Sequence, residues 1–294
     1  MDHPDDLFTL RNYFYVGLYQ EAIAEGSGLG GIPEHAAIEK DELIYRSYIA
    51  MGQASKVTEA VKDDAPASLQ AVKLLAVYTA QPENRDMVML TMGDYLSDPV
   101  SANNTTLQLI AAIIYCLEDN VKEAIKLIHN GVTMEQISFL AQIYLRMDRV
   151  DLALAQLQIL QQADDDATLT QLVGAWVHMA KGGKKVREAA YIYDELIDKY
   201  AASPMLLNGM AVARMHLGEW GDAEAALQEA FTKAPTDADT LINLIACCQH
   251  TNKPDATIER HIAQLKASHP AHPYIADVTN VESAFSRVAA QFAA

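Results

Sequence analysis

Cysteine is scarce in this chain of 294 residues, and long apolar runs are absent. The three cysteines are Cys116, Cys247 and Cys248; their number is odd and two are adjacent, so they do not make a disulfide framework. We interpret them as buried, reduced thiols of a cytosolic protein. The longest apolar run, residues 109–117, is far shorter than the roughly 20 residues that span a bilayer, so we expect no direct membrane insertion.

Positive charge is also in short supply. The chain has 22 Lys and Arg residues against 39 Asp and Glu residues, and its formal net charge is −17. Such an acidic chain is repelled by phosphate backbones and anionic lipid headgroups, which argues against nucleic acid as a partner and against electrostatic docking on membranes. The start, MDHPDDLF, lacks the basic and apolar regions of a signal peptide, so we expect no secretory signal.

Strand patterns and linkers are missing as well. β-Branched runs are rare, and no stretch alternates apolar and polar residues long enough to favour a strand. No segment rich in Pro, Gly and Ser divides the chain. We therefore predict a single all-α array over residues 1–294.

One segment shows what the array is made of. Residues 204–237 contain a first helical pattern that ends at Gly218 and a second that carries Ala223, Leu227 and Ala230 and stops at Pro235. This is the 34-residue helix-turn-helix pattern of a tetratricopeptide repeat (TPR). Such a unit cannot bury its apolar face alone, so it stacks on copies of itself and forms a concave surface suited to holding another protein.

A small residue recurs at the same repeat position along the chain. Ala189, Ala223 and Thr257 are 34 positions apart, and equivalent positions upstream give six or seven hairpins. Small residues suit these positions because the two helices of a hairpin approach closely there. We predict an all-α, TPR-like helical-hairpin solenoid that forms a right-handed superhelix, with its clearest repeats at 134–169, 170–203, 204–237 and 238–271. The pattern does not define the geometry of residues 74–96.

Motifs that suggest chemistry have simpler interpretations. Gly26-x-Gly28-x-x-Gly31 matches a dinucleotide fingerprint, but no strand precedes it, so we predict a flexible loop over residues 26–33 inside the first hairpin. His269 and His272 form a close pair without a third residue spaced to complete a metal site. We predict no catalytic, cofactor-binding or metal-binding residues. An enzyme site assembled across repeats stays open as an alternative.

The inner surface is the candidate partner site. In a repeat array the second, fifth, ninth and twelfth positions of each first helix point inward, and two of the five sets counted are largely apolar. The predicted partner-binding groove consists of Leu109, Ile113, Cys116, Leu145, His178, Met205, Asn208, Val212, Met215, Ile242 and Ala246. A partner with apolar anchors would cover these residues. Irregular packing that buries them inside the array is the alternative.

The inner positions do not favour an acidic peptide as the partner. Their only cation is Lys181, whereas receptors for chaperone tails use a basic clamp. A folded or extended protein segment fits better.

Longer stretches make a more specific family resemblance. They include DLFTLRNYFYVGLYQEAI (6–23), NTTLQLIAAIIY (104–115), DDDATLTQLVGAWV (164–177), LLNGMAVARMHLGEWGDAEAALQEA (206–230) and TLINLIACCQHTNKP (240–254). From about residue 6 to the end, in this order and without large insertions, the chain resembles the epsilon subunit of coatomer, the COPI vesicle coat.

The resemblance implies a non-catalytic coat subunit without a cofactor. It would bind and stabilise the C-terminal domain of the alpha coat subunit and, through it, join beta-prime and the rest of coatomer. It would be cytoplasmic and peripheral on Golgi membranes and COPI-coated vesicles, where it would support retrograde Golgi-to-ER and intra-Golgi transport. The nearest alternative is a cytosolic TPR adaptor or co-chaperone that binds peptide tails. A self-assembling scaffold is a further one.

Overall fold

The computed structural model describes residues 5–292, and within them the chain is all α-helical apart from turns and two short 3₁₀ segments. No strand occurs in this range, so the all-α prediction is confirmed. The chain forms two compact units, one up to Ile192 and one from Tyr193 onward. Residues 1–4 and 293–294 of the predicted array lie outside the described range.

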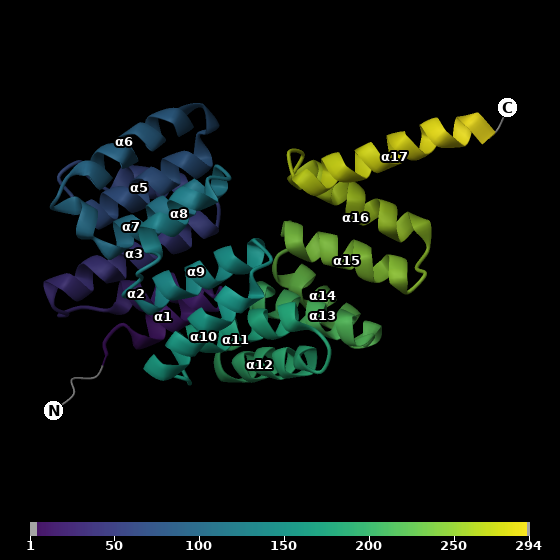
Figure 1. Ribbon diagram of the computed structural model, residues 1–294, viewed down its shortest axis with the longest axis horizontal. Helices are drawn as coiled ribbons and strands as arrows, with labels where there is room; N and C mark the ends of the chain where they lie inside the picture. Colours follow the sequence, from purple (N-terminus) through teal and green to yellow (C-terminus); the bar gives the residue numbers. More distant parts are fainter. Residues whose placement is uncertain (1–4, 293–294) are drawn as a thin grey trace. The chain divides into compact units, whose positions relative to one another are not determined.

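The first unit begins with α1 (Phe8–Tyr15) and continues to α12 (Lys185–Tyr200), which contains the boundary (Figure 1). Between them lie α2 (Tyr19–Gly28), α3 (Glu34–Ala50), α4 (Ala54–Ala60), α5 (Ala67–Ala80), α6 (Arg85–Ser97), α7 (Thr105–Leu117), α8 (Val121–Ile128), α9 (Met134–Arg146), α10 (Val150–Ala163) and α11 (Thr168–Lys181). The undefined region 74–96 contains the end of α5, a 3₁₀ turn at Pro82–Asn84 and most of α6.

The second unit consists of two hairpins and a final helix. Its helices are α13 (Pro204–Leu217), α14 (Trp220–Lys233), α15 (Ala238–His250), α16 (Asp255–Ser268) and α17 (Pro273–Phe292). In Figure 1, α17, drawn in yellow, is the outermost helix of this unit. The core of the α13–α14 hairpin includes Leu207, Ala211, Ala223 and Leu227.

The recurring small residues lie where the helices of a hairpin meet. Ala189 and Ala223 have no exposed surface, and the same holds for the equivalent residues upstream, Ala22, Val57, Ala124 and Ala153. A larger side chain at such a position would push two helices apart. Thr257, the last of the series, is only half-buried.

The hairpin turns share one backbone device. Gly17, Gly52 and Gly218 adopt φ of 79°, 72° and 78°, the left-handed conformation that glycine enters without strain. At Gly218 the following amide, that of Glu219, donates to the carbonyl of Arg214 over 2.9 Å, which closes the helix end.

Three other hairpins make the same turn without glycine. Asp119 and Asp148 adopt φ of 59° and Asn252 adopts 52°, and their following amides donate to the carbonyl five positions back. Asp and Asn are the residues that tolerate this region best after glycine. The same left-handed turn therefore recurs in these hairpins, although the residue type at its position changes.

Some helix starts, among them those of α13 and α7, are capped by side chains. Ser203, which precedes Pro204, accepts a hydrogen bond from the amide of Leu206 over 3.1 Å. Asn104 caps α7 in the same way through the amide of Leu107 at 2.8 Å. These caps satisfy amide groups that have no partner inside the helix.

The predicted loop over residues 26–33 is wrong in part. Helix α2 extends to Gly28, and the segment that follows leads to α3, which begins the next hairpin. Gly26 is buried, and a β-carbon built on it would lie 2.8 Å from the side chain of Ile44 on α3. Glycine at this position therefore permits close packing of α2 on α3.

Candidate partner-binding surface

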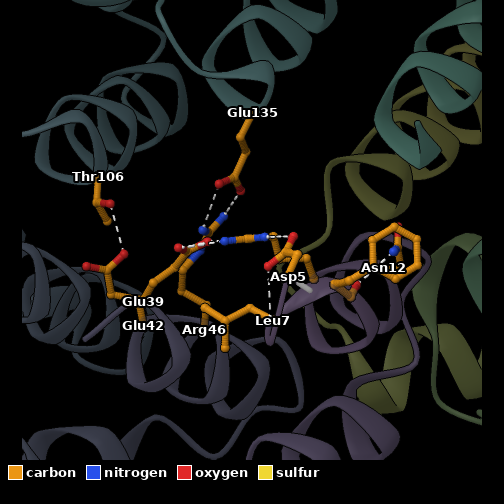
Figure 2. Close-up of polar contacts among 10 residues, drawn as sticks. Asp5, Leu7, Asn12, Glu39, Glu42, Arg46, Thr106 and Glu135 are labelled. Carbon is orange, nitrogen blue, oxygen red and sulfur yellow. Dashed lines mark hydrogen bonds and ion pairs between the residues drawn. The ribbon is translucent and has the colours of Figure 1, made fainter. Parts of the chain in front are cut away.

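A half-buried ion pair joins two distant helices of the first unit. Arg46 on α3 and Glu135 in the first turn of α9 are 89 residues apart, and Arg46 makes two hydrogen bonds to the Glu135 carboxylate (Figure 2). One of them, Nη1 to Oε2, is 3.1 Å long. The guanidinium also lies over the ring of Phe14, 4.6 Å from its centroid. Burial opposes the charge of Arg46, but Glu135 outweighs this effect, so the pKa of Arg46 is raised.

A second contact connects α3 to α7. The Thr106 hydroxyl donates to Oε2 of Glu42 over 2.9 Å, and Glu42 is only 7% exposed (Figure 2). Burial raises the pKa of Glu42, while hydrogen bonds from Ser68 and Thr106 act in the opposite direction. Thr106 and Glu135 are the second residues of α7 and α9, a position predicted to point inward. Helix α3 therefore covers part of the inner face of these two helices.

The first helix reaches further still. Arg11 on α1 donates to Glu39 on α3, with Nη2 to Oε2 at 2.9 Å, and also pairs with Asp5. The Thr168 hydroxyl at the start of α11 donates to Oδ1 of Asn12 over 2.6 Å, across 156 residues of sequence. The first unit therefore folds back on itself, with α1 and α3 against α9 and α11.

These contacts affect the predicted groove residues of the first unit. Leu109 and Cys116 are buried, with 3% and 8% exposure, and Cys116 packs in the core shared by α7, α8 and α9. Ile113, Leu145 and His178 are half-buried. Burial lowers the pKa of His178, which lies 3.8 Å from Glu188. Leu109 and Cys116 thus serve the packing between helices, and Ile113 and Leu145 also pack against neighbouring cores.

The six predicted residues of the second unit are brought together on two adjacent helices. Met205, Asn208, Val212 and Met215 lie on α13, and Ile242 and Ala246 lie on α15, which packs against α13. Met205 is 39% exposed, and all the others except Asn208 are half-buried. Met205 and Val212 therefore remain accessible, whereas Met215 and Ile242 pack against neighbouring cores.

Asn208 fixes the spacing of α13 and α15. Its amide nitrogen donates to the Thr240 hydroxyl over 2.7 Å, and its amide oxygen accepts from Asn243 over 2.9 Å. Asn208 is 8% exposed, so these bonds satisfy polar atoms that water does not reach freely. Its observed contacts are therefore internal to the hairpin stack.

Metal-binding groups do not converge in the described part of the chain. Residues 5–292 contain no cluster of three or more His, Cys, Asp or Glu side chains arranged to hold a metal ion. Burial raises the pKa of the Cys247 and Cys248 thiols, which reduces their nucleophilic thiolate form. No helix in this range is long and apolar enough to cross a bilayer.

One exposed apolar surface was missed at the sequence level. Val281, Phe285, Val288 and Phe292 on α17 are 69%, 73%, 51% and 86% exposed. Their spacings of four, three and four residues place them on one helix face. That spacing is visible in the sequence, but the final helix lies beyond the predicted repeats.

Comparisons with known proteins give a consistent family. The family model described as coatomer epsilon subunit matches residues 3–293. Coatomer subunit epsilon-1 of Arabidopsis thaliana is 40% identical over 293 residues, covering 100% of this chain and 99% of the relative. Coatomer subunit epsilon of Dictyostelium discoideum is 35% identical over 289 residues, covering 96% of each.

Solved structures show the same architecture at lower sequence identity. A chain of the APC/C hetero-tetramer Cut9–Hcn1 superposes with a TM-score of 0.63 at 16% identity, covering 92% of this chain and 53% of that one. A tetratricopeptide repeat protein from Parabacteroides merdae gives 0.59 at 13% identity, covering 88% and 96%. The TPR-like fold class predicted from the sequence is confirmed.

Proposed function

The chain belongs to the coatomer epsilon subunit family, and from this premise we propose that it binds and stabilises the C-terminal domain of the alpha coat subunit. Through that domain it would join beta-prime and the rest of coatomer. Membership of a COPI coat subunit family, matched along almost the whole chain, carries this proposal. We further propose a non-catalytic subunit without a cofactor, peripheral on Golgi membranes and COPI-coated vesicles from the cytoplasmic side, in retrograde Golgi-to-ER and intra-Golgi transport.

The apolar face of α13 and α15 supports a protein partner. Met205 and Val212 present accessible side chains from a helix that also packs in a core through Leu207 and Ala211. The inner face of the first unit is partly covered by α3, so we place the main contact on the second unit. A stable coat contact would bury roughly 2,000 Å² or more in total.

Binding would also stabilise the epsilon chain. A partner that binds the folded array and not the unfolded chain stabilises the fold by RT ln(1 + [L]/Kd), where [L] is the free partner concentration. This is about 4 kcal/mol when [L] is 1,000 times Kd. Addition of the purified alpha C-terminal domain should therefore raise the melting temperature of this chain. A short acidic peptide should leave it unchanged, whereas a peptide-tail adaptor would respond to the peptide.

Substitutions on α13 test the proposed surface. Val212→Asp combined with Met205→Asp should weaken binding to the alpha C-terminal domain at least tenfold, because two charges would be buried without partners. Gln228→Asp, at an exposed position on α14, is the control and should bind like the unchanged chain. Circular dichroism and thermal melts must show that all variants remain folded. Equal affinities of the double variant and the control would refute this placement.

A further inference from the structure

The final helix presents an apolar face that the described chain leaves uncovered. None of residues 273–292 is buried within residues 5–292, although Tyr274 and Ile275 at its start pack against Leu241, Ile245 and Leu265. We call the four exposed side chains Val281, Phe285, Val288 and Phe292 the α17 stripe. A row of large apolar side chains on one helix face marks an interaction site when nothing in its own fold covers it.

The size of the α17 stripe limits what it can do alone. Two phenylalanines and two valines at these exposures offer on the order of 500 Å². Each partner in a stable complex of standard size buries about 800 Å². The stripe therefore fits a second contact that adds to a larger interface. A groove contacts a docked helix from both sides, so it covers such a stripe better than the side of a single helix does.

The charges beside the stripe define the rim of the groove. At about 100° per residue, Asp277 and Glu282 project about 50° and about 90° from the middle of the stripe, whereas Arg287 projects about 130° from it. All three residues are exposed. The flanks nearest the stripe are thus acidic, as is the whole chain with its net charge of −17. A second copy or an anionic membrane would meet like charge, while a partner with basic residues would meet opposite charge.

We propose that the α17 stripe docks into an apolar groove with Lys and Arg on its rim, on the same coat partner that binds the α13–α15 face. This inference rests on the proposed function and adds a separate contact to it. The stripe supplies the apolar anchors, and Asp277 and Glu282 supply the charge complementarity that orients the helix in the groove.

Binding of the full chain to the recombinant alpha C-terminal domain tests this contact by calorimetry. Phe285→Ser with Val288→Ser should weaken binding at least tenfold. Ala276→Ser with Ala290→Ser places two serines on the opposite face of the same helix, where both residues are exposed, and should change affinity less than twofold. Asp277→Lys with Glu282→Lys should weaken binding more at 50 mM salt than at 300 mM salt.

The outcomes separate this inference from the proposed function. If the unchanged chain binds and the stripe variant binds equally well, the docking of α17 is overturned and the proposed function stands. If the unchanged chain does not bind, both are overturned. If light scattering shows that the unchanged chain is a dimer and the stripe variant a monomer, the stripe binds a second copy of the chain. Flotation with phosphatidylserine vesicles that requires the stripe would assign it to a membrane; either result overturns the groove.

Discussion

Gly209 on α13 and Tyr193 on α12 lie so close that a β-carbon built on Gly209 would be 2.5 Å from ring carbon Cε1 of Tyr193. Tyr193 is 5% exposed, so its ring has little room to move away. Glycine at position 209 thus has a packing reason, although glycine inside a helix is otherwise unfavourable.

The first prediction concerns this contact. Gly209→Ala should lower the free energy of unfolding by about 1–3 kcal/mol, because the added methyl group overpacks the contact with Tyr193. Gly221→Ala is the matched control, since a β-carbon there meets no described atom within 4 Å. It should leave stability unchanged or raise it slightly. Urea unfolding curves measure both, and equal stability of the two variants would contradict the close approach.

The second prediction concerns the small residue inside the α13–α14 hairpin. Ala223 is fully buried against Leu207 and Leu227, so Ala223→Leu should destabilise the fold by about 1–3 kcal/mol through overpacking. Ala225, two residues along the same helix, is exposed, and Ala225→Leu should have little effect. Thermal melts compare the two. An unaltered melting temperature in Ala223→Leu would count against the role of small residues in these hairpins.

The hairpin turns show how far the sequence predicts the fold. Gly17, Gly52 and Gly218 are recognisable because glycine enters left-handed backbone without strain. Asp119 and Asn252 make the same turn, but their residue types are also common in caps and loops, so sequence alone does not identify them. Local rules therefore predict the hairpins, while the register of some turns depends on the packing around them.

The candidate site is predicted less fully from the sequence because it depends on the rotations of many successive hairpins. Each hairpin rotates slightly relative to the one before it, and the sum of these rotations brings Arg46 to Glu135 across 89 residues. The helices of the first unit differ in length, which changes this sum, so ideal repeat positions do not show that Leu109 and Cys116 are buried. In the second unit the repeats are regular, and Val212 remains accessible.

The third prediction concerns the ion pair of the first unit. Arg46→Met should destabilise the fold by about 1–3 kcal/mol, because it leaves the half-buried carboxylate of Glu135 without its cation. The double variant Arg46→Met, Glu135→Leu should recover much of this loss, since it removes a charge together with its partner.

A surface pair provides the comparison for Arg46. Arg149 and Asp151 form an ion pair on the exposed surface at 2.7 Å, and Arg149→Met should not change stability measurably. Chemical unfolding of the unchanged chain, Arg46→Met, Glu135→Leu and the double variant forms a double-mutant cycle, and Arg149→Met is its control. Additive effects of the Arg46 and Glu135 substitutions would show that the two side chains do not interact in solution.

The fourth prediction concerns His261, which is buried at 1% exposure in the core of the second unit. Neither ring nitrogen has a hydrogen-bond partner among the described residues, and the ring packs edge-on against Phe231 at 5.9 Å. Burial lowers the pKa of His261, and the nearby charge of Arg260 acts in the same direction. The folded chain therefore favours the neutral imidazole.

The sign of the pH effect follows from this lowered pKa. An unfolded His binds a proton at about pH 6.5, so between that pH and the lower pKa of the fold the unfolded chain binds more protons. The free energy of unfolding should have its full value above about pH 7 and should fall as the pH drops below about 6.5. His261→Leu should reduce this fall in urea unfolding at pH 7.5 and 5.5. His178, whose pKa burial also lowers, should account for part of the remaining pH dependence. If the leucine variant loses as much stability as the unchanged chain between the two pH values, His261 does not stay neutral in the folded core.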